Sequence, residues 1–415
     1  MSAPAYCRQV KFLMVIIGGA ADEPIPDLDD RTPLEAAATP GLDALAQSGR
    51  VGRVGLIPKT ATPAPHTARA ALFGHEVTGS EPGRAALLAA ARGVDARGGT
   101  LLAVDLLSVT GEPGDLGRDG RVVSVGAEAM SEAEATALVQ DFAAELGDRF
   151  PGFELHAPID GVAIAVDRAA TAYGRTETVA ASELIDYAWA PSLPDGGEGG
   201  ERLGAFVGLS HAFLTDHPIN RARVEQTLPP VNMLWPSGPC IQAKLDALDS
   251  RFGRSTLVIS DDEATRGLAI ASGLRARPAP PASELTASAV AAFEDHEVVV
   301  VTVEAPDRAS RRADWRGKIE SIERIDAGVI TPLSRALSET FGDEGWRSIV
   351  VVDHATPCET RQTDSVPTPF LMSGAFVRSV VRRPFTEAAA AESDLRVEVG
   401  HELMEFFLRS GLRGR

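Results

Sequence analysis

A carboxylate and an imidazole directly follow an apolar run near the end of the chain. Asp353 and His354 come after Val350–Val352. Consecutive β-branched residues indicate a buried strand, and α/β proteins bind ligands at the carboxyl edge of such strands. Aspartate and histidine suit a metal such as zinc or manganese. The pair predicts where a functional site lies, although two side chains do not complete a metal site.

The elements that must position this pair alternate between strands and helices. We expect buried strands at 12–17, 51–57, 255–260, 298–303 and 347–352, and helices at 40–48, 67–73, 263–273, 315–341 and 398–408. Thr39 is expected to cap the first helix through its side chain, with Pro40 at the first helical position. Strands that alternate with helices predict an α/β fold with a mostly parallel central sheet flanked by helices.

The middle of the chain has a different pattern. Short alternating strands surround a helix that Ser131 and Glu134 begin as a capping box, while Gly196–Gly200 is expected to form a flexible loop. We therefore predict an inserted smaller α+β domain at 98–231, between core segments at 1–97 and 232–415.

Composition narrows the classes of partner and compartment. The 415 residues carry a net charge of −18, which disfavours nucleic acid and anionic membranes because phosphate contacts need clustered cations. The three cysteines, Cys7, Cys240 and Cys358, form no CxxC motif, so a reducing cytoplasm is expected. The apolar run at 11–17 is too short for a signal peptide or a membrane span.

Several segments, taken in order along the chain, resemble the alkaline phosphatase superfamily and most closely its archaeal-type cofactor-independent phosphoglycerate mutases. These segments are Ile17–Pro26, Thr32–Ala37, Thr39–Asp43, His217–Asn220, Pro229–Met233, Gly317–Asp326 and Asp353–Cys358. The resemblance implies a serine nucleophile that carries the phosphoryl group and two divalent metals that neutralise its charge. It implies that both lie at the carboxyl ends of the central strands.

Position by position, the chain departs from this family pattern. Asp307, Asp353 and His354 match the expected metal ligands. The other expected groups are replaced: an aspartate by Gly18, the serine by Pro65, the aspartate after it by His66, and two histidines by Arg311 and Thr363. In the middle domain, Ile159-Asp160 stands where the resemblance implies a His-Arg pair.

The replacement of a histidine by Arg311 bears directly on metal binding. Arginine keeps its proton in proteins and does not bind these metals. Its fixed charge would oppose a divalent cation by roughly 4–8 kcal/mol at contact distance near a protein surface. The first interpretation is therefore a diverged relative with no metal cofactor and no mutase activity. It would bind a small anionic molecule through Arg69, Arg308 and Arg311, or catalyse a different reaction in the old cleft.

Other interpretations stay open at this point. Thr67 could serve as a nucleophile and His66 as its base, with Asp307, Asp353 and His354 holding one Mn, Zn or Mg ion. Equally, Thr67 could simply belong to the first turn of a helix, and the aspartates could pair with the arginines and close the pocket. A third interpretation is a non-catalytic scaffold or partner subunit, and a homo-oligomer is possible in each case.

Overall fold

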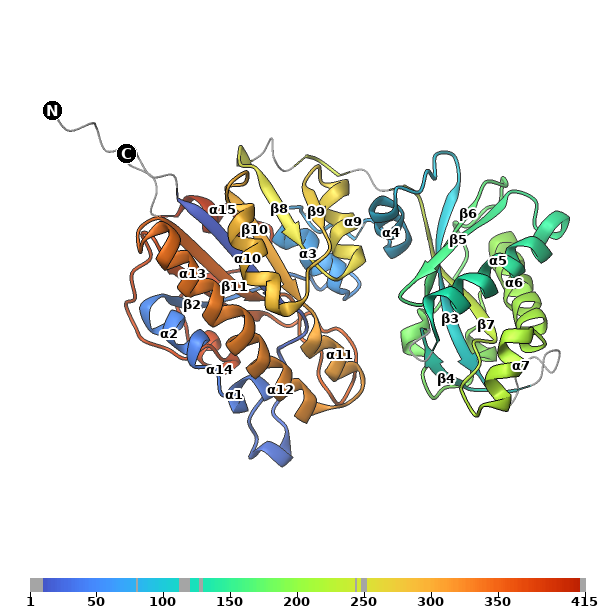
Figure 1. Cartoon of the computed structure of the whole chain (residues 1–415), viewed down its shortest axis with the longest axis horizontal. Helices are drawn as coiled ribbons and strands as arrows, with labels where there is room; N and C mark the ends of the chain where they lie inside the picture. Colours follow the sequence, from blue (N-terminus) through green and yellow to red (C-terminus); the bar gives the residue numbers. More distant parts are fainter. Residues whose placement is uncertain are drawn as a thin grey trace. The chain divides into compact units, whose positions relative to one another are not determined.

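The computed structural model describes residues 10–79, 81–111, 120–126, 130–242, 245–247 and 252–410. The chain forms two compact units, an inserted unit of Pro82–Ala243 and a core unit made of the residues on either side (Figure 1). The expected boundaries at 98 and 231 lie inside the inserted unit. They were misplaced because α4 (Arg84–Arg92) and β7 (Met233–Cys240) both pack on the sheet of that unit.

The core unit is built on an eight-stranded sheet in the order β13-β2-β12-β11-β1-β10-β8-β9. Strand β12 pairs antiparallel with both neighbours, and the other pairings are parallel, which confirms the α/β class with a mostly parallel sheet. The strands are β1 Lys11–Ile17, β2 Arg50–Val54, β8 Thr256–Ile259, β9 Arg275–Arg277, β10 Val298–Val303, β11 Trp346–Val352, β12 Thr368–Gly374 and β13 Arg396–Val397.

Both faces of the central strands are buried, which explains their continuous apolar sequences. Leu13 and Val15 of β1 belong to a core cluster shared with α2, α10, α12 and α13, whereas Phe12 points to the other face and contacts Phe407 of α15. The helices are α1 Pro33–Ala36, α2 Pro40–Ser48, α3 Pro65–Leu72, α9 Glu263–Ala271, α10 Ala282–Ala292, α11 Ala305–Arg311, α12 Trp315–Ile325, α13 Thr331–Phe341, α14 Glu387–Ala391 and α15 Glu402–Arg409.

The long helix expected at 315–341 is interrupted. A π-helical segment, Asp326–Ile330, separates α12 from α13. Pro332 has no N–H to donate to the preceding turn, and the carboxylate of Asp326 accepts the amides of Gly41 and Leu42 at 2.9 and 2.6 Å. Asp326 therefore caps α2 from a distant part of the chain. Thr39 does occupy the N-cap position with Pro40 first in the helix, as expected, but its side chain makes no capping hydrogen bond.

The inserted unit contains an antiparallel sheet in the order β4-β3-β6-β5, with β7 also paired to β3. Its elements are α4, β3 Thr100–Val109, β4 Val122–Val125, α5 Glu132–Leu146, β5 Phe153–Ile159, β6 Val162–Asp167, α6 Gly197–Thr215, α7 Pro218–Glu225 and β7. The capping box of Ser131 and Glu134 is confirmed at the start of α5.

The flexible loop expected at Gly196–Gly200 is wrong. Gly197–Gly200 form the first turn of α6, and Gly199 and Gly200 are buried. A Cβ at Gly200 would lie 2.3 Å from the carbonyl carbon of Asp195, so the glycines permit close packing rather than flexibility.

Two further expectations concern the cysteines and membranes. Cys240 and Cys358 are free thiols, and Cys7 lies outside the described residues. Within the described part of the chain, no helix has the length and apolar character needed to cross a membrane.

Candidate functional site

Four loops at the carboxyl ends of adjacent strands converge on one place in the core unit. Gly18 follows β1, Asp262 follows β8, Glu304 follows β10, and Asp353 follows β11. In each case an apolar strand ends at the sheet edge, and a glycine or a carboxylate residue follows within three positions. The residue that joins these loops is Arg69, from the middle of α3.

The guanidinium of Arg69 is 2% exposed and contacts three carboxylates. Its Nε donates to Oδ2 of Asp353 at 2.8 Å, its Nη2 donates to Oε2 of Glu304 at 2.6 Å, and its Nη1 donates to Oδ2 of Asp262 at 2.8 Å. Nη1 also donates to the hydroxyl of Thr265 at 2.6 Å. One fixed cation thereby ties together three strand ends.

Gly18 leaves room for this arrangement. A Cβ at Gly18 would lie 2.3 Å from Oε2 of Glu304 and 3.2 Å from Nη2 of Arg69. The Glu304–Arg69 ion pair therefore occupies the space that any side chain at Gly18 would need. Gly19 is constrained too: its φ is +62°, and a Cβ there would meet Asp307 at 2.7 Å.

A second cluster surrounds Asp307 on α11. Its Oδ2 accepts from Nε of Arg311 at 2.8 Å, and its Oδ1 accepts from the hydroxyl of Thr356 at 2.7 Å and lies 3.2 Å from Nε2 of His354. Nη2 of Arg311 also donates to the hydroxyl of Thr363 at 3.1 Å. Arg311 and Thr363 thus contact each other at the two positions where the family resemblance implies histidines.

His354 lies between the two clusters. Its Nδ1 is 2.7 Å from Oδ1 of Asp353, a close charge contact without good hydrogen-bond direction, while Nε2 faces Asp307. Burial alone would lower the pKa of His354. The close charge of Asp353 and the hydrogen bond and charge of Asp307 outweigh burial and raise that pKa to about 9. His354 is therefore an imidazolium at neutral pH.

The carboxylates respond to these cations in different ways. Burial works against ionisation of Asp307, but the hydrogen bond from His354 and the charge of Arg311 hold its pKa well below its usual range. Burial likewise opposes ionisation of Asp353, and the charges of His354 and Arg69 still lower its pKa. Glu304 differs: burial raises its pKa to about 7 despite Arg69, with Asp353 adding repulsion. Its Oε1 is buried and has no hydrogen-bond partner among the described residues.

Comparison with known proteins agrees with the fold. Residues 46–220 match the family described as 2,3-bisphosphoglycerate-independent phosphoglycerate mutase. A probable mutase of this type from Geobacter sulfurreducens is 29% identical over 96% of this chain and 100% of its own length. The corresponding mutase of Methanopyrus kandleri is 28% identical over 93% of this chain and 92% of its own length.

Solved structures give the same result for the architecture. A Pyrococcus horikoshii protein, PH0037, superposes with a TM-score of 0.73 at 23% identity, covering 98% of both chains. The cofactor-independent phosphoglycerate mutase of Thermoplasma acidophilum gives 0.58 at 19% identity, covering 98% of this chain and 100% of its own. Over nearly its whole length, this chain is thus similar to 2,3-bisphosphoglycerate-independent phosphoglycerate mutases, and it shares the fold of these two solved structures.

The residues of this mutase-like chain that could bind a metal do not fit one in the observed arrangement. Both ring nitrogens of His354 face carboxylates rather than an open position. Oδ2 of Asp353 and Oδ2 of Asp307 each accept an arginine N–H. These contacts do not favour the alternative in which Asp307, Asp353 and His354 jointly hold one ion, which stays a prediction.

The other predicted site residues have separate outcomes. Arg69 was expected to bind an anionic ligand, and this is corrected: all three of its nitrogens donate to protein oxygens, and its side chain is buried. The hydroxyl of Thr67 is buried and donates to the carbonyl of Thr62 at 3.4 Å, which fits the first turn of α3 rather than a nucleophile. His66 is half-buried beside it.

Arg308 and Arg311 remain at the edge of the site. Arg308 is 3.4 Å from Asp261, and its side chain is 55% exposed. The side chain of Arg311 is 32% exposed. Both lie on α11, three positions apart, so they share one side of that helix.

Sequence reasoning missed several members of this site. Glu304 directly follows the apolar run of β10, and Asp262 comes three positions after β8, so the signal that identified Asp353 could have found both. Lys318 carried no such signal. Its fully buried ammonium donates to Oδ2 of Asp22 and to the carbonyls of Ala21 and Thr356 at 2.8–3.1 Å. Lys318 thereby joins the loop after β1 to the loop after β11.

Proposed function

We propose that this mutase-like protein does not transfer phosphoryl groups through a serine and two divalent metals. Its cleft instead functions without a metal and binds a small anionic molecule at the edge formed by α11. The observation that carries this proposal is the contact of Arg69 with three carboxylates from three strand ends. These are the strand ends at which the superfamily resemblance implies metals.

Electrostatics support the absence of a metal. A divalent cation about 4 Å from a guanidinium is repelled by roughly 8 kcal/mol at an effective dielectric of 20. Arg69 cannot lose its proton to relieve that repulsion, since its carboxylate partners outweigh burial and raise its pKa still further. The guanidinium of Arg311 beside Asp307 would repel a divalent cation in the same way. Two arginines thus supply positive charge at the two clusters.

The missing nucleophile supports the same proposal. Pro65 has no hydroxyl, and it begins α3 at the position of the expected serine. The nearest hydroxyl along the chain, on Thr67, is buried and bonded to a carbonyl. Phosphoryl transfer through a covalent intermediate needs an exposed, activated nucleophile, and these two residues do not provide it.

An anionic ligand is favoured by the two arginines of α11. Guanidinium groups bind carboxylates and phosphates through paired N–H donors. Arg308 and Arg311 are partly exposed, and each already faces an aspartate, Asp261 or Asp307. A small phosphate or carboxylate ligand would add to these pairs at their solvent side, whereas Arg69 stays buried and structural.

Metal content and turnover test the first half of the proposal. The full-length protein would be incubated with Mn²⁺, dialysed, analysed for metals, and assayed with 3-phosphoglycerate beside the Methanopyrus kandleri mutase as the active control. We expect no metal above the buffer level and no turnover. Two metal equivalents per chain together with turnover would overturn the proposal.

Calorimetric titration with inorganic phosphate and 3-phosphoglycerate tests the second half. Arg308→Gln and Arg311→Gln should each weaken binding at least tenfold. Arg335→Gln is the matched control, because Arg335 forms an exposed pair with Glu339 on α13. If all three variants bound the anions equally well, the proposed anion site would be refuted. The interpretation as a non-catalytic partner subunit would then be favoured.

A further inference from the structure

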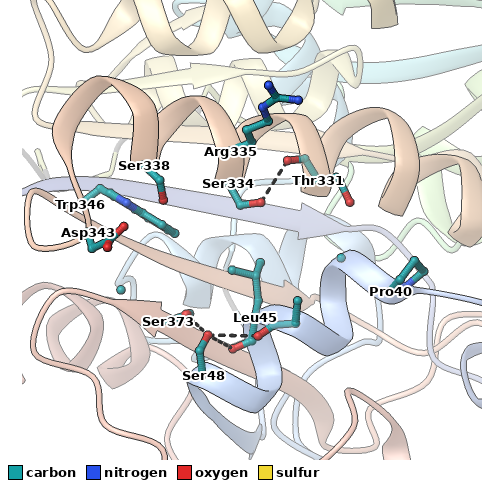
Figure 2. Close-up of a pocket in the computed structure, with 13 residues that line it drawn as sticks. Pro40, Leu45, Ser48, Thr331, Ser334, Arg335, Ser338, Asp343, Trp346 and Ser373 are labelled. Atoms are coloured by element: carbon teal, nitrogen blue, oxygen red, sulfur yellow. Dashed lines mark hydrogen bonds between the residues drawn. The ribbon is translucent and has the colours of Figure 1, made fainter.

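A groove lies at the edge of the core sheet opposite to the candidate site. It runs between α2 and α13, has a volume of about 640 Å³, and is bounded by the first residue of β11, Trp346, and the last residue of β12, Gly374. Figure 2 shows Leu45 and Ser48 of α2 facing Ser334 and Ser338 of α13 across it. Its volume falls in the range of ligand and peptide sites.

The interior of the groove is mostly apolar, and its lining includes two charged residues, Asp343 and Arg335, of which Arg335 is already paired with Glu339. Ala44, Leu45 and Trp346 contribute apolar surface, and Asp343 stands at one end (Figure 2). Asp343 and Glu344 are both exposed in the turn after α13. In addition, the Nε1–H of the buried Trp346 has no acceptor among the described residues. The groove therefore fits an apolar segment with flanking cations and a free carbonyl.

The loop that begins beside this groove has those properties. Residues 375–386 contain three arginines and neither aspartate nor glutamate, in a chain whose net charge is −18. Phe376, Val380 and Val381 are 49%, 79% and 57% exposed. Arg378 and Arg382 are exposed between and after them. Exposed apolar side chains gathered in one short loop indicate an interaction surface.

We propose that this groove receives the 376–382 loop of a second copy of the chain, forming a symmetric dimer. Gly374 lines the groove and the loop starts at the next residue, so both partners of the contact lie on one patch of the surface. A two-fold axis makes such a patch complementary to itself, because each copy gives a loop and receives one. This contact goes beyond the proposed function and does not depend on it.

The charges of the loop and of the groove favour a second copy of the chain as the partner that binds here. The remainder of this acidic chain repels other copies, whereas the loop carries Arg378 and Arg382 toward a rim that carries Asp343 and Glu344. Val380 and Val381 then lie between the two arginines, as an apolar pair that matches Leu45 and Trp346. Oppositely charged surfaces also raise the rate and specificity of association.

Sedimentation velocity of the full-length protein over a range of concentrations tests the dimer. We expect a dimer whose Kd rises at least tenfold in Val380→Asp/Val381→Asp and in Ala44→Arg, which fills the groove from an exposed helix position. Val224→Asp is the matched control, since Val224 is 59% exposed on α7 of the inserted unit. Circular dichroism and melting temperature would verify that every variant is folded.

A charge exchange tests the specific pairing. Arg382→Glu should weaken the dimer, and adding Asp343→Arg to the same chain should restore at least part of the lost affinity. A wild-type protein that stays monomeric at the highest concentration would overturn the proposal. So would a dimer that the loop and groove variants leave unchanged, since the groove would then serve a small molecule or another protein.

Discussion

Replacing Arg69 by methionine removes the cation that joins three strand ends while keeping a side chain of similar length. Methionine is flexible enough to fill the vacated space, so the cavity left behind is small. The main consequence is electrostatic, because Asp353, Glu304 and Asp262 lose the guanidinium that each contacts at 2.6–2.8 Å. Two of these carboxylates are buried, and water cannot replace the lost contacts.

The expected loss of stability is about 3–5 kcal/mol at pH 8, the range for removing one partner of a buried ion pair. Typical domains are stable by only about 5–15 kcal/mol, so this would be a large fraction of the total. Asp262 contributes least to the loss because its side chain is 32% exposed. Asp353, whose side chain is fully buried, contributes most.

The loss should depend on pH in a defined direction. In the wild type, burial opposes ionisation of Asp353, but His354 and Arg69 lower its pKa, so this carboxylate stabilises the folded state above its unfolded pKa. Without Arg69, burial and mutual repulsion raise the pKa values of Asp353 and Glu304. Carboxyls with raised pKa values destabilise the folded state increasingly as pH rises. The difference between variant and wild type should therefore be smaller at pH 5 than at pH 8.

Urea unfolding at both pH values, with hydrogen exchange of β11 to follow the core unit, measures this loss. Arg335→Met is the control, because Arg335 and Glu339 form an exposed pair that is expected to contribute less than about 1 kcal/mol. The reasoning would be refuted if Arg69→Met were as stable as Arg335→Met at pH 8. A loss that is equal at pH 5 and pH 8 would show that packing, rather than charge, is the cause.

Three further predictions concern Arg69, His354 and Asp326. Arg69→Ala leaves three carboxylates around an emptied space, so Mn²⁺ should raise the melting temperature of this variant and not that of the wild type; equal shifts would contradict a guanidinium in a metal position. His354 has a raised pKa of about 9, so its charge should stabilise the fold by about 3 kcal/mol below pH 6.5, and the advantage over His354→Gln should disappear as pH rises through 9; a constant difference in urea unfolding would argue against an imidazolium. Asp326→Ala removes the acceptor of two helix amides and should cost about 1–2 kcal/mol in urea unfolding, whereas unchanged stability would mean that Asp326 does not cap α2.

The fold could be predicted because its strands are buried on both faces. Apolar runs such as Val298–Val303 and Val350–Val352 indicate strands buried on both faces, and the order of the family-like segments supported the fold class. The antiparallel strand β12, Thr368–Gly374, was missed, since its sequence mixes apolar residues with Thr, Pro, Ser and Gly. The cap of α2 was also beyond local reasoning, because Asp326 reaches it from 285 positions away.

The sequence predicted a site beside Asp353 and His354, but it did not indicate which side chains pair there. Arg311 and Thr363, at positions where the resemblance implies histidines, share one hydrogen bond, and Arg311 also donates to Asp307, which faces His354. Nothing local indicated that Arg69, at the middle of a short helix, would be 2% exposed and bound to three carboxylates. Long-range ion pairs are decided by packing, which a single sequence does not display.

Charge balance connects the two clusters. The site brings together four carboxylates, on Asp262, Glu304, Asp307 and Asp353, and three cations, on Arg69, Arg311 and His354. The one carboxyl left without a full counter-charge should be the one that takes up a proton most easily. Glu304 fulfils this condition, since burial raises its pKa to about 7 and its Oε1 has no hydrogen-bond partner among the described residues. The cations at these strand ends thus almost equal the carboxylates in number, and the remaining buried carboxyl can be neutral.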